Sequence, residues 1–259
     1  MRLLIESKPK LEVFVALFSL LKNWGNAIRL QFEKTHLYIQ TMDKSHVCLC
    51  NILIDKSWFS EYDVSRSNNI VVDALHFCLI VNQVLKNSKL EIKCEDETEK
   101  EHLYINLLNN KETKDGFDHF YEIPLIDLEQ DILEIPEVNY DIEFSMDTKR
   151  MSDLVSELAL VGGDLNIVAS EDVLEFHSQG DTGKLKINIP IENLGEYAID
   201  EGANLHVSYS INHVGKMCLA SKLSSEIQIG ISAEYPMSLK YNLGDNSTAV
   251  FYVAPKIVD

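Results

Sequence analysis

The feature that most constrains this chain is an internal repeat of alternating segments. Residues 27–42 and 164–179 both alternate apolar and polar side chains over two successive stretches, and a period of two is typical of strands with one buried face. A shift of 137 positions superimposes five apolar or small pairs: Ile28 and Leu165, Leu30 and Ile167, Leu37 and Leu174, Ile39 and Phe176, Thr41 and Ser178. Helical patterns precede both copies, so the repeat predicts two equivalent domains, each with two helices backed by antiparallel strands.

Helical and strand patterns fill most of the chain, with few helices among many strands. Apolar residues at helical spacing predict helices over 10–23, 73–87, 147–161 and 212–223. Alternation predicts strands over 27–34, 35–42, 46–54, 89–94, 102–108, 140–146, 165–170, 173–178, 184–191, 203–211, 225–233, 237–243 and 249–255. We therefore expect an α+β fold.

Composition is that of a globular protein. Hydrophobic residues make up 46% and charged residues 25% of the chain, and no apolar stretch reaches the roughly 18–20 residues that span a bilayer. The N-terminal residues lack the pattern of a secretory signal. The five cysteines are odd in number and include no CxxC, which indicates a reducing compartment. We expect a soluble intracellular protein without a membrane segment.

The net charge of −18 comes from 23 Lys and Arg against 41 Asp and Glu. Taken alone, it argues against nucleic-acid binding, because contacts to phosphate require clustered positive charge. The sequence also lacks a phosphate loop, a paired-acid constellation and a nucleophile elbow, so an enzyme is the least favoured class.

The stretch TMDKSHVCLC, residues 41–50, gathers reactive side chains. Asp43, Ser45 and His46 could suggest a hydrolase triad, and His46, Cys48 and Cys50 half of a zinc site. On a strand, however, alternate positions spread these groups along one face instead of converging on one ion. Buried cysteines that act as small hydrophobic residues are favoured, so we expect no metal, no cofactor and no catalytic residue.

Residues 121–140 have the composition of a linker. Pro124 and Pro136 interrupt both helix and central-strand patterns, and six acids are mixed with irregularly spaced apolar residues. We expect this linker to join an N-terminal domain, 1–120, to a C-terminal domain, 141–259. Its exposed apolar residues would invite a partner.

Three motifs together resemble the eukaryotic DNA sliding clamp, the proliferating cell nuclear antigen family. They are TMDKSHV at 41–47, DLEQDILEIPEVNY at 127–140 and FYVAPKIVD at 251–259, and the resemblance covers the whole chain. It implies a homotrimeric ring around double-stranded DNA, with antiparallel sheets outside and helices lining the hole. Such a clamp tethers DNA polymerase and other replication and repair proteins that carry clamp-binding peptide motifs. A clamp loader and a place in the nucleus, or in a viral replication compartment, are implied as well.

The resemblance also implies site residues. Partner peptides would bind a hydrophobic pocket lined by Met42, His46, Val47, Leu49, Leu133, Ile135, Pro136, Tyr140, Pro236, Tyr252, Ala254, Pro255 and Lys256. One subunit edge would be the strand around Phe117, Phe120 and Tyr121, and the other would be residues 184–189, including Leu185 and Ile187, with Leu158 and Val161 beneath.

The chain departs from the family on the helices that should face DNA. Glu12, Val13 and Ser19 stand where the family's inner lysines are expected, and the second half places Asp153, Ser156 and Leu160 at such positions. The remaining candidates for contact with DNA phosphates are Lys8, Lys10, Lys22, Lys86, Lys89, Lys149, Arg150, Lys216 and Lys222. Each could equally be solvated surface charge. The alternative function is therefore a clamp-fold scaffold that binds proteins, or one subunit of a mixed ring, with little DNA binding.

Overall fold

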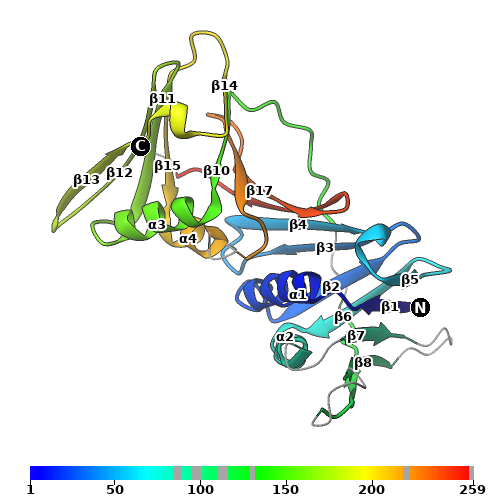
Figure 1. The fold of residues 1–259 in the computed structure, drawn as a ribbon. Coiled ribbons are helices and arrows are strands. Elements are labelled where there is room, and N and C mark those ends of the chain that lie inside the picture. Colours follow the sequence, from blue (N-terminus) through cyan, green and yellow to red (C-terminus); the bar gives the residue numbers. More distant parts are fainter. Residues whose placement is uncertain (85–88, 95–100, 110–115, 129–131, 219–221, 257–259) are drawn as a thin grey trace. The chain divides into compact units, whose positions relative to one another are not determined.

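A computed structural model describes residues 1–84, 89–94, 101–109, 116–128, 132–218 and 222–256 (Figure 1). Lys86, a predicted DNA contact, lies outside these residues. The chain divides into two compact units. The first unit comprises Met1–Lys44, Cys50–Leu133 and Leu243–Ala249, and the second comprises Ser45–Leu49, Glu134–Asn242 and Val250–Asp259. No described helix is long and apolar enough to cross a membrane.

The first unit contains two helices and most of the N-terminal strands. Its five-stranded sheet has the order β5-β1-β7-β8-β9, and β3, β2 and β6 are consecutive neighbours in a second sheet. The helices are α1 (Lys8–Leu21) and α2 (Ala74–Gln83), and the strands are β1 (Arg2–Ile5), β2 (Ala27–Phe32), β3 (His36–Met42), β5 (Glu61–Asp63), β6 (Asn68–Asp73), β7 (Lys89–Lys93), β8 (His102–Leu108) and β9 (His119–Pro124). Most of β4 (Cys48–Asp55) and the 3-10 turn η1 (Lys56–Trp58) also belong here.

The second unit repeats this plan. A four-stranded sheet has the order β13-β12-β11-β15, and β14, β10, β16 and β17 are neighbours in another. The elements are β10 (Ile142–Asp147), α3 (Thr148–Ala159), β11 (Asp164–Ser170), β12 (Val173–Gly180), β13 (Gly183–Asn188), the 3-10 turn η3 (Ile191–Asn193), β14 (Glu196–Ile199), β15 (Leu205–Ser210), α4 (Ile211–Cys218) and β16 (Glu226–Ile231). The last strands, β17 (Met237–Gly244) and β18 (Ser247–Val253), are divided between the units.

The predicted repeat is confirmed by strand register. In the first unit β2 pairs with β6 so that Ile28 lies opposite Val72, and in the second β11 pairs with β15 so that Leu165 lies opposite Tyr209. Both partners are displaced by the same 137 positions that relate the sequences. All ten residues of the five repeated pairs are buried. The alternating positions therefore build the same core twice.

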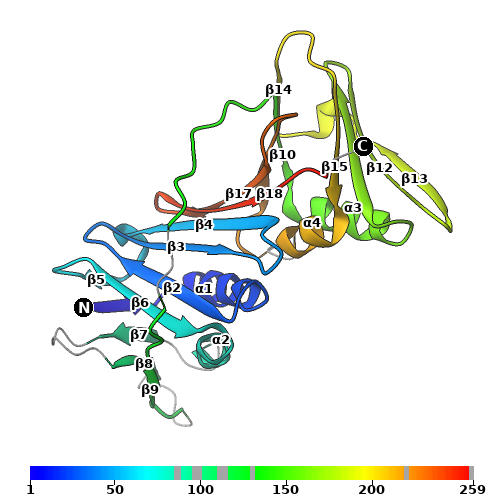
Figure 2. The ribbon, with the colours of Figure 1, turned by 180° about the vertical axis from the view of Figure 1, so that it is seen from behind.

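Each unit packs a pair of helices together. In the first, the Phe18 ring lies between Phe14 of α1 and Phe77 of α2, with ring centroids 4.7 and 4.8 Å away. In the second, α3 and α4 lie side by side in both views (Figure 1 and Figure 2). Asp73 and Asp147 cap α2 and α3, because each carboxylate accepts a backbone N–H in the first turn at 2.8 Å.

Four helices lie where they were predicted, with differences at their ends; residues 85–87 and 219–221 of two predicted helices lie outside the described residues. The sequence analysis missed strands β1, β5, β6 and β14. Strand β6, for example, is a short run with few exposed positions and shows no clean alternation. Strand β9 also includes residues 121–124, which were expected to begin the linker.

Candidate functional site

The end of the TMDKSHV loop is hydrogen-bonded to the C-terminal segment of the chain, and both belong to the second unit. The Ala254 N–H donates to the Val47 carbonyl at 3.0 Å, and the Lys256 N–H donates to the Ser208 carbonyl at 2.7 Å. His46 adopts a left-handed backbone conformation, with φ 57°, and its side chain is exposed. Ser45 Oγ lies 3.2 Å from His213 Nε2. The loop therefore presents His46 at a tight turn beside the C-terminal segment.

The cysteines of this stretch lie in the core. Cys48 and Cys50 are 2% and 0% exposed, and burial raises the pKa of the Cys50 thiol well above its ordinary value. A protonated, inaccessible thiol is a poor nucleophile and a poor metal ligand. The interpretation of these cysteines as small hydrophobic residues agrees with this placement.

The first unit holds the start of the linker by its backbone. The side chain of Gln40 donates to the Leu133 carbonyl at 2.9 Å and accepts from the Leu133 N–H at 2.7 Å. Further upstream, the Ile126 N–H donates to the Val71 carbonyl at 2.9 Å. Ile132 and Leu133 remain 41% and 46% exposed. The linker thus displays apolar side chains, while both backbone polar groups of Leu133 are paired.

The second unit anchors the end of the linker through Tyr140. The tyrosine is half-buried, and a Cβ on Gly230 would come within 2.5 Å of its ring. Burial raises the pKa of Tyr140, although a hydrogen bond with Ser238 acts in the opposite direction. Gly230 is therefore the residue that leaves room for this ring.

The predicted peptide-binding residues fall into two groups, one in each unit. Met42 and Leu133 belong to the first unit. The second-unit group, which is exposed or half-buried, consists of His46, Val47, Leu49, Ile135, Pro136, Tyr140, Pro236, Tyr252, Ala254, Pro255 and Lys256. Lys256 also forms an ion pair with Asp164. Sequence reasoning missed Gln40, Ser208 and Asp164, whose contacts join residues far apart in the chain.

Both predicted subunit edges are edge strands. In the described part of the chain, β9 pairs only with β8 and β13 only with β12. Phe117 and Phe120 are 78% and 71% exposed, while Tyr121, Leu185 and Ile187 are half-buried. Exposed aromatic residues beside an open strand edge are typical of a surface that another chain covers.

Leu158 requires a correction. It was expected to pack at the subunit edge, but it is 0% exposed within the single chain. Its position on the buried face of α3 places it in the core of the second unit. Val161 is half-buried, so part of its side chain remains accessible. Leu160, which lies between Leu158 and Val161 in the sequence, is 82% exposed.

Four of the predicted DNA contacts gather at one end of the helix pair in the second unit. Lys149 and Arg150 begin α3, and Thr148 donates its N–H to the Ser225 carbonyl at 2.9 Å, which brings this end of α3 to the segment after α4. Lys216 lies in the last turn of α4 and Lys222 follows that helix. All four side chains are exposed and none forms an ion pair with another described residue. The four are called the α3–α4 cluster: Lys149, Arg150, Lys216 and Lys222.

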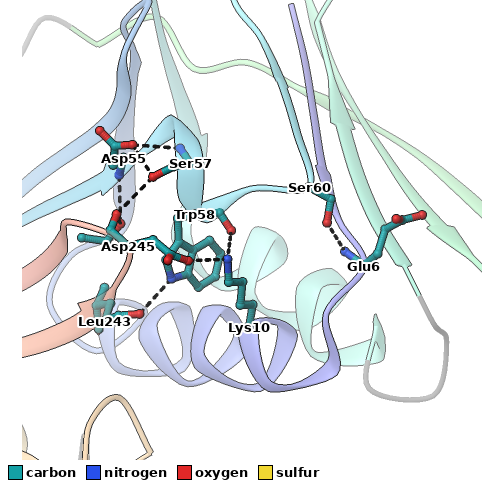
Figure 3. Close-up of polar contacts among 9 residues, drawn as sticks. Glu6, Lys10, Asp55, Ser57, Trp58, Ser60, Leu243 and Asp245 are labelled. Carbon is teal, nitrogen blue, oxygen red and sulfur yellow. Dashed lines mark hydrogen bonds and ion pairs between the residues drawn. The ribbon is translucent and has the colours of Figure 1, made fainter.

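In the first unit, by contrast, two of the predicted DNA contacts are engaged internally. Lys10 Nζ pairs with Asp245 at 2.6 Å and donates to the Trp58 carbonyl at 2.7 Å (Figure 3). Lys89 pairs with Glu6. The corresponding helix α2 exposes apolar side chains, with Leu75 and Leu79 about half exposed. Lys8 and Lys22 are the described candidates here that form no ion pair with another described residue.

Comparison with known proteins covers nearly the whole chain. The family model described as "Proliferating cell nuclear antigen, N-terminal domain" matches residues 9–132, and the one described as its C-terminal domain matches residues 134–256. The chain is 28% identical over 226 residues to "Proliferating cell nuclear antigen" of Chaetomium thermophilum, with 85% of each chain covered. It is 26% identical over 249 residues to "DNA polymerase sliding clamp 3" of Sulfurisphaera tokodaii, with 95% of this chain and 96% of the relative covered.

The fold agrees with that of a solved structure. The crystal structure of a PCNA2–PCNA3 complex from Sulfolobus tokodaii superimposes with a TM-score of 0.85, and 99% of each chain is covered at 23% identity. The shared architecture is two domains, each with two helices and antiparallel sheets. On the two family matches and this doubled fold, the chain belongs to the proliferating cell nuclear antigen family.

Proposed function

We propose that this protein is a DNA sliding clamp, a processivity factor that tethers DNA polymerase and other replication and repair proteins to duplex DNA. The observation that carries the proposal is the doubled clamp fold, in which register and core repeat across both halves. Relatives over nearly the full length are named as sliding clamps. The protein then acts by tethering and catalyses no reaction.

The open edges β9 and β13 support assembly into a ring. They are two unlike edges on one chain, and a head-to-tail contact between unlike edges closes into a ring when the rotation permits. We propose three identical subunits, which a clamp loader opens and closes on DNA. Since eukaryotic relatives include those of Plasmodium falciparum and Drosophila melanogaster, the nucleus is the proposed compartment.

Within such a ring, contact with DNA would fall mainly on the second unit. The α3–α4 cluster offers four exposed cations, although Asp147 caps α3 and Asp153 lies on that helix. In the first unit Lys10 and Lys89 are already paired with carboxylates. Because few cations are available to contact phosphate, affinity for duplex DNA should be weak, so retention would rest on encirclement.

We propose that apolar residues of the linker are the anchors for partner peptides. Exposed Leu133 and half-buried Ile135 are suitable apolar anchors, and truncating a central anchor typically costs about 2–4 kcal/mol of binding. Leu133→Ala or Ile135→Ala should weaken a peptide carrying Gln, an aliphatic residue and two aromatics by about tenfold or more. Ser45→Ala and Cys48→Ala should change affinity only a few-fold, and zinc chelators should change nothing.

Retention on DNA tests the proposal. The protein is loaded onto nicked circular DNA with a clamp loader, and the complex is followed by gel filtration before and after the circle is cut. Release upon linearisation is expected of a closed ring. Equal retention on circular and linear DNA would exclude the topological mechanism.

A scaffold or a mixed-ring subunit with little DNA binding is the second candidate. The scarcity of unpaired cations on the first-unit helices favours it, and the similar solved structure is titled as a complex of two different clamp proteins. Light scattering separates the candidates, because a monomer that persists across micromolar concentrations contradicts the homotrimer.

A further inference from the structure

Two histidines of the second unit approach each other over a strand that lies between them. His177 is on β12 and His206 is on β15, and the sheet order β13-β12-β11-β15 places β11 between these two strands. Their ring centroids are 6.0 Å apart, and the ring planes are inclined by 35°. Strands two places apart in a sheet are separated by about 9.5 Å, so the two rings lean toward each other above β11.

Strand register places both histidines on the face of this sheet that points away from the core. Ile167 of β11 lies opposite Phe176 and Val207, and all three side chains are buried. Because side chains alternate along a strand, the next residue on β12, His177, and the preceding residue on β15, His206, point to the other face. His177 is half-buried there and His206 is exposed, so an ion from solvent can reach the pair.

The surroundings favour the neutral form of His177. Burial is the largest cause, and it lowers the pKa of this side chain below its ordinary value. Three nearby basic groups act in the same direction, namely Lys184, His206 and Lys186, whereas Glu175 opposes them. A neutral imidazole offers a nitrogen lone pair to a metal, which an imidazolium does not. At neutral pH His177 is therefore available as a ligand.

The separation of the rings suits two imidazoles on one ion. Zn²⁺ lies about 2.0–2.1 Å from an imidazole nitrogen, so two rings that share an ion have centroids about 5–6.5 Å apart. The observed 6.0 Å falls within this range. In the described part of the chain, no acid or cysteine forms a group of three ligands with the pair, and Glu175 is engaged with Lys186 at 2.6 Å. Water would therefore complete the coordination.

We propose that His177 and His206 together bind one divalent ion of a late transition metal such as Zn²⁺, each through an imidazole nitrogen. Imidazole suits Zn²⁺, Cu²⁺ and Ni²⁺, whereas Mg²⁺ and Ca²⁺ require oxygen ligands. Lys184 and Lys186 on the neighbouring strand also disfavour any cation that is held by electrostatic attraction alone. Both histidines belong to one unit, so the site does not depend on the proposed ring.

The ion would join strands that are not direct neighbours. His177 and His206 lie on the two strands that flank β11, so an ion held by both would hold β12 and β15 together in addition to their hydrogen bonds with β11. A ligand that binds the folded chain better than the unfolded one raises stability. The proposed site should therefore stabilise this sheet when the metal is present.

Calorimetric titration of the untagged chain with Zn²⁺ tests the pair. His177→Ala and His206→Ala should each weaken binding by at least about tenfold, since the loss of even an outer-shell partner of a metal ligand costs about 10–100-fold. His36→Ala with His76→Ala removes two surface histidines of the first unit and is the matched control, which should bind like the natural chain. Equal affinity in all these variants would overturn the site.

The choice of metal gives a second comparison. Cu²⁺ should bind more tightly than Zn²⁺ or Ni²⁺ to the same two nitrogens, and excess Mg²⁺ should not displace Zn²⁺. Displacement by Mg²⁺ would show that the ion is held by carboxylates elsewhere on this acidic chain and would contradict the assignment to imidazoles.

Chemical modification locates the ion. Diethyl pyrocarbonate reacts with neutral imidazole nitrogens, and peptide mass spectrometry measures the reaction at each histidine separately. Zn²⁺ should slow modification of His177 and His206 several-fold and leave that of His36 and His76 unchanged. Protection spread evenly over all four would show that the ions attach to the surface without a defined site.

Thermal melts test the bridge and exclude folding defects. Zn²⁺ should raise the melting temperature of the natural chain, and EDTA should reverse the rise. Circular dichroism without metal establishes that each variant is folded, and His177→Asn and His206→Asn provide polar replacements if an alanine variant is not. No folded variant of either histidine should respond to Zn²⁺. A natural chain that melts at the same temperature with and without the ion would contradict the proposal.

Discussion

Gln40 and Leu133 form two hydrogen bonds, in which the glutamine amide group pairs with both backbone polar groups of the leucine. The pair holds a linker residue beside β3 of the first unit and leaves the leucine side chain 46% exposed. The linker is thus pre-ordered where we propose that it binds a partner peptide. Ordering in advance lowers the entropic cost of binding.

Gln40→Ala should therefore weaken peptide binding without removing any proposed anchor. A typical hydrogen bond contributes about 0.5–1.5 kcal/mol, so the loss of two, about 1–3 kcal/mol together, should reduce affinity by about fivefold or more in a fluorescence-polarisation titration. Amide exchange at Leu133 should also become faster. Gln228→Ala, on an exposed position of β16, is the control. Unchanged affinity for Gln40→Ala would show that the linker needs no such support.

Lys10 and Lys8 should behave differently although both were predicted to face DNA. Lys10→Ala leaves the Trp58 carbonyl without its charged donor, and we expect the free energy of unfolding to fall by about 1–2 kcal/mol in urea. The partner Asp245 is half exposed, so the ion pair itself contributes little of this. Lys8→Ala should stay within about 0.5 kcal/mol of the natural chain. Equal stability of the two variants would contradict the structural role.

Glu91 should make the stability of the first unit sensitive to acid. Burial acts to raise the pKa of this carboxyl, but hydrogen bonds from Lys93, Arg2 and Asn106 outweigh it and hold the pKa below its ordinary value of 4.5. The carboxylate therefore stabilises the fold fully above that value, and the contribution disappears as pH falls through the lower pKa of the folded state.

Glu91→Gln should accordingly lower the free energy of unfolding at neutral pH. The difference from the natural chain should shrink in denaturant titrations performed progressively below pH 4.5. Glu12→Gln, at an exposed position on α1, should show no such convergence. A difference between Glu91→Gln and the natural chain that is constant with pH would mean that the side chain acts through packing alone.

The cysteines should be unreactive in the folded protein. All five are free and buried, and burial raises the pKa of Cys218 to about 12, so almost no thiolate forms near pH 8. Ellman's reagent should detect no rapidly reacting thiol in native buffer and all five in guanidinium chloride. A fast-reacting thiol without denaturant would show that one of these side chains becomes accessible.

Local pattern was sufficient for much of the fold. Alternation at Ile28 and Leu30 matched that at Leu165 and Ile167, and the repeated register follows from it because strand side chains have a strict period of two. Strand β13 was also predictable, since the run KLKINI carries lysines on one face and apolar residues on the other, whereas β9 was expected only from the family resemblance. Such features are set by neighbours in sequence.

Contacts between distant residues were not predictable in the same way. Lys10 was predicted to contact DNA from the start of a helix. It instead pairs with Asp245, which lies near the other end of the chain. Leu158 sits two residues before the highly exposed Leu160, and only the packed structure distinguishes the buried side of α3 from the open one. Gln40 had no motif to mark it. Tertiary packing decided these roles, which periodicity alone does not encode.

The hairpin residues Leu243–Ala249 belong to the first unit, and this has a consequence for the order of folding during synthesis. Trp58 donates its indole N–H to the Leu243 carbonyl at 2.9 Å, and Asp245 meets Lys10 (Figure 3). When the ribosome has made only the first half, the Trp58 N–H lacks this acceptor, and leaving a buried donor unpaired costs about 1–3 kcal/mol. The first unit is therefore synthesised first but completed last. We expect a fragment ending at Leu133 to reach the native fold of that unit only when a peptide spanning 243–249 is supplied in trans.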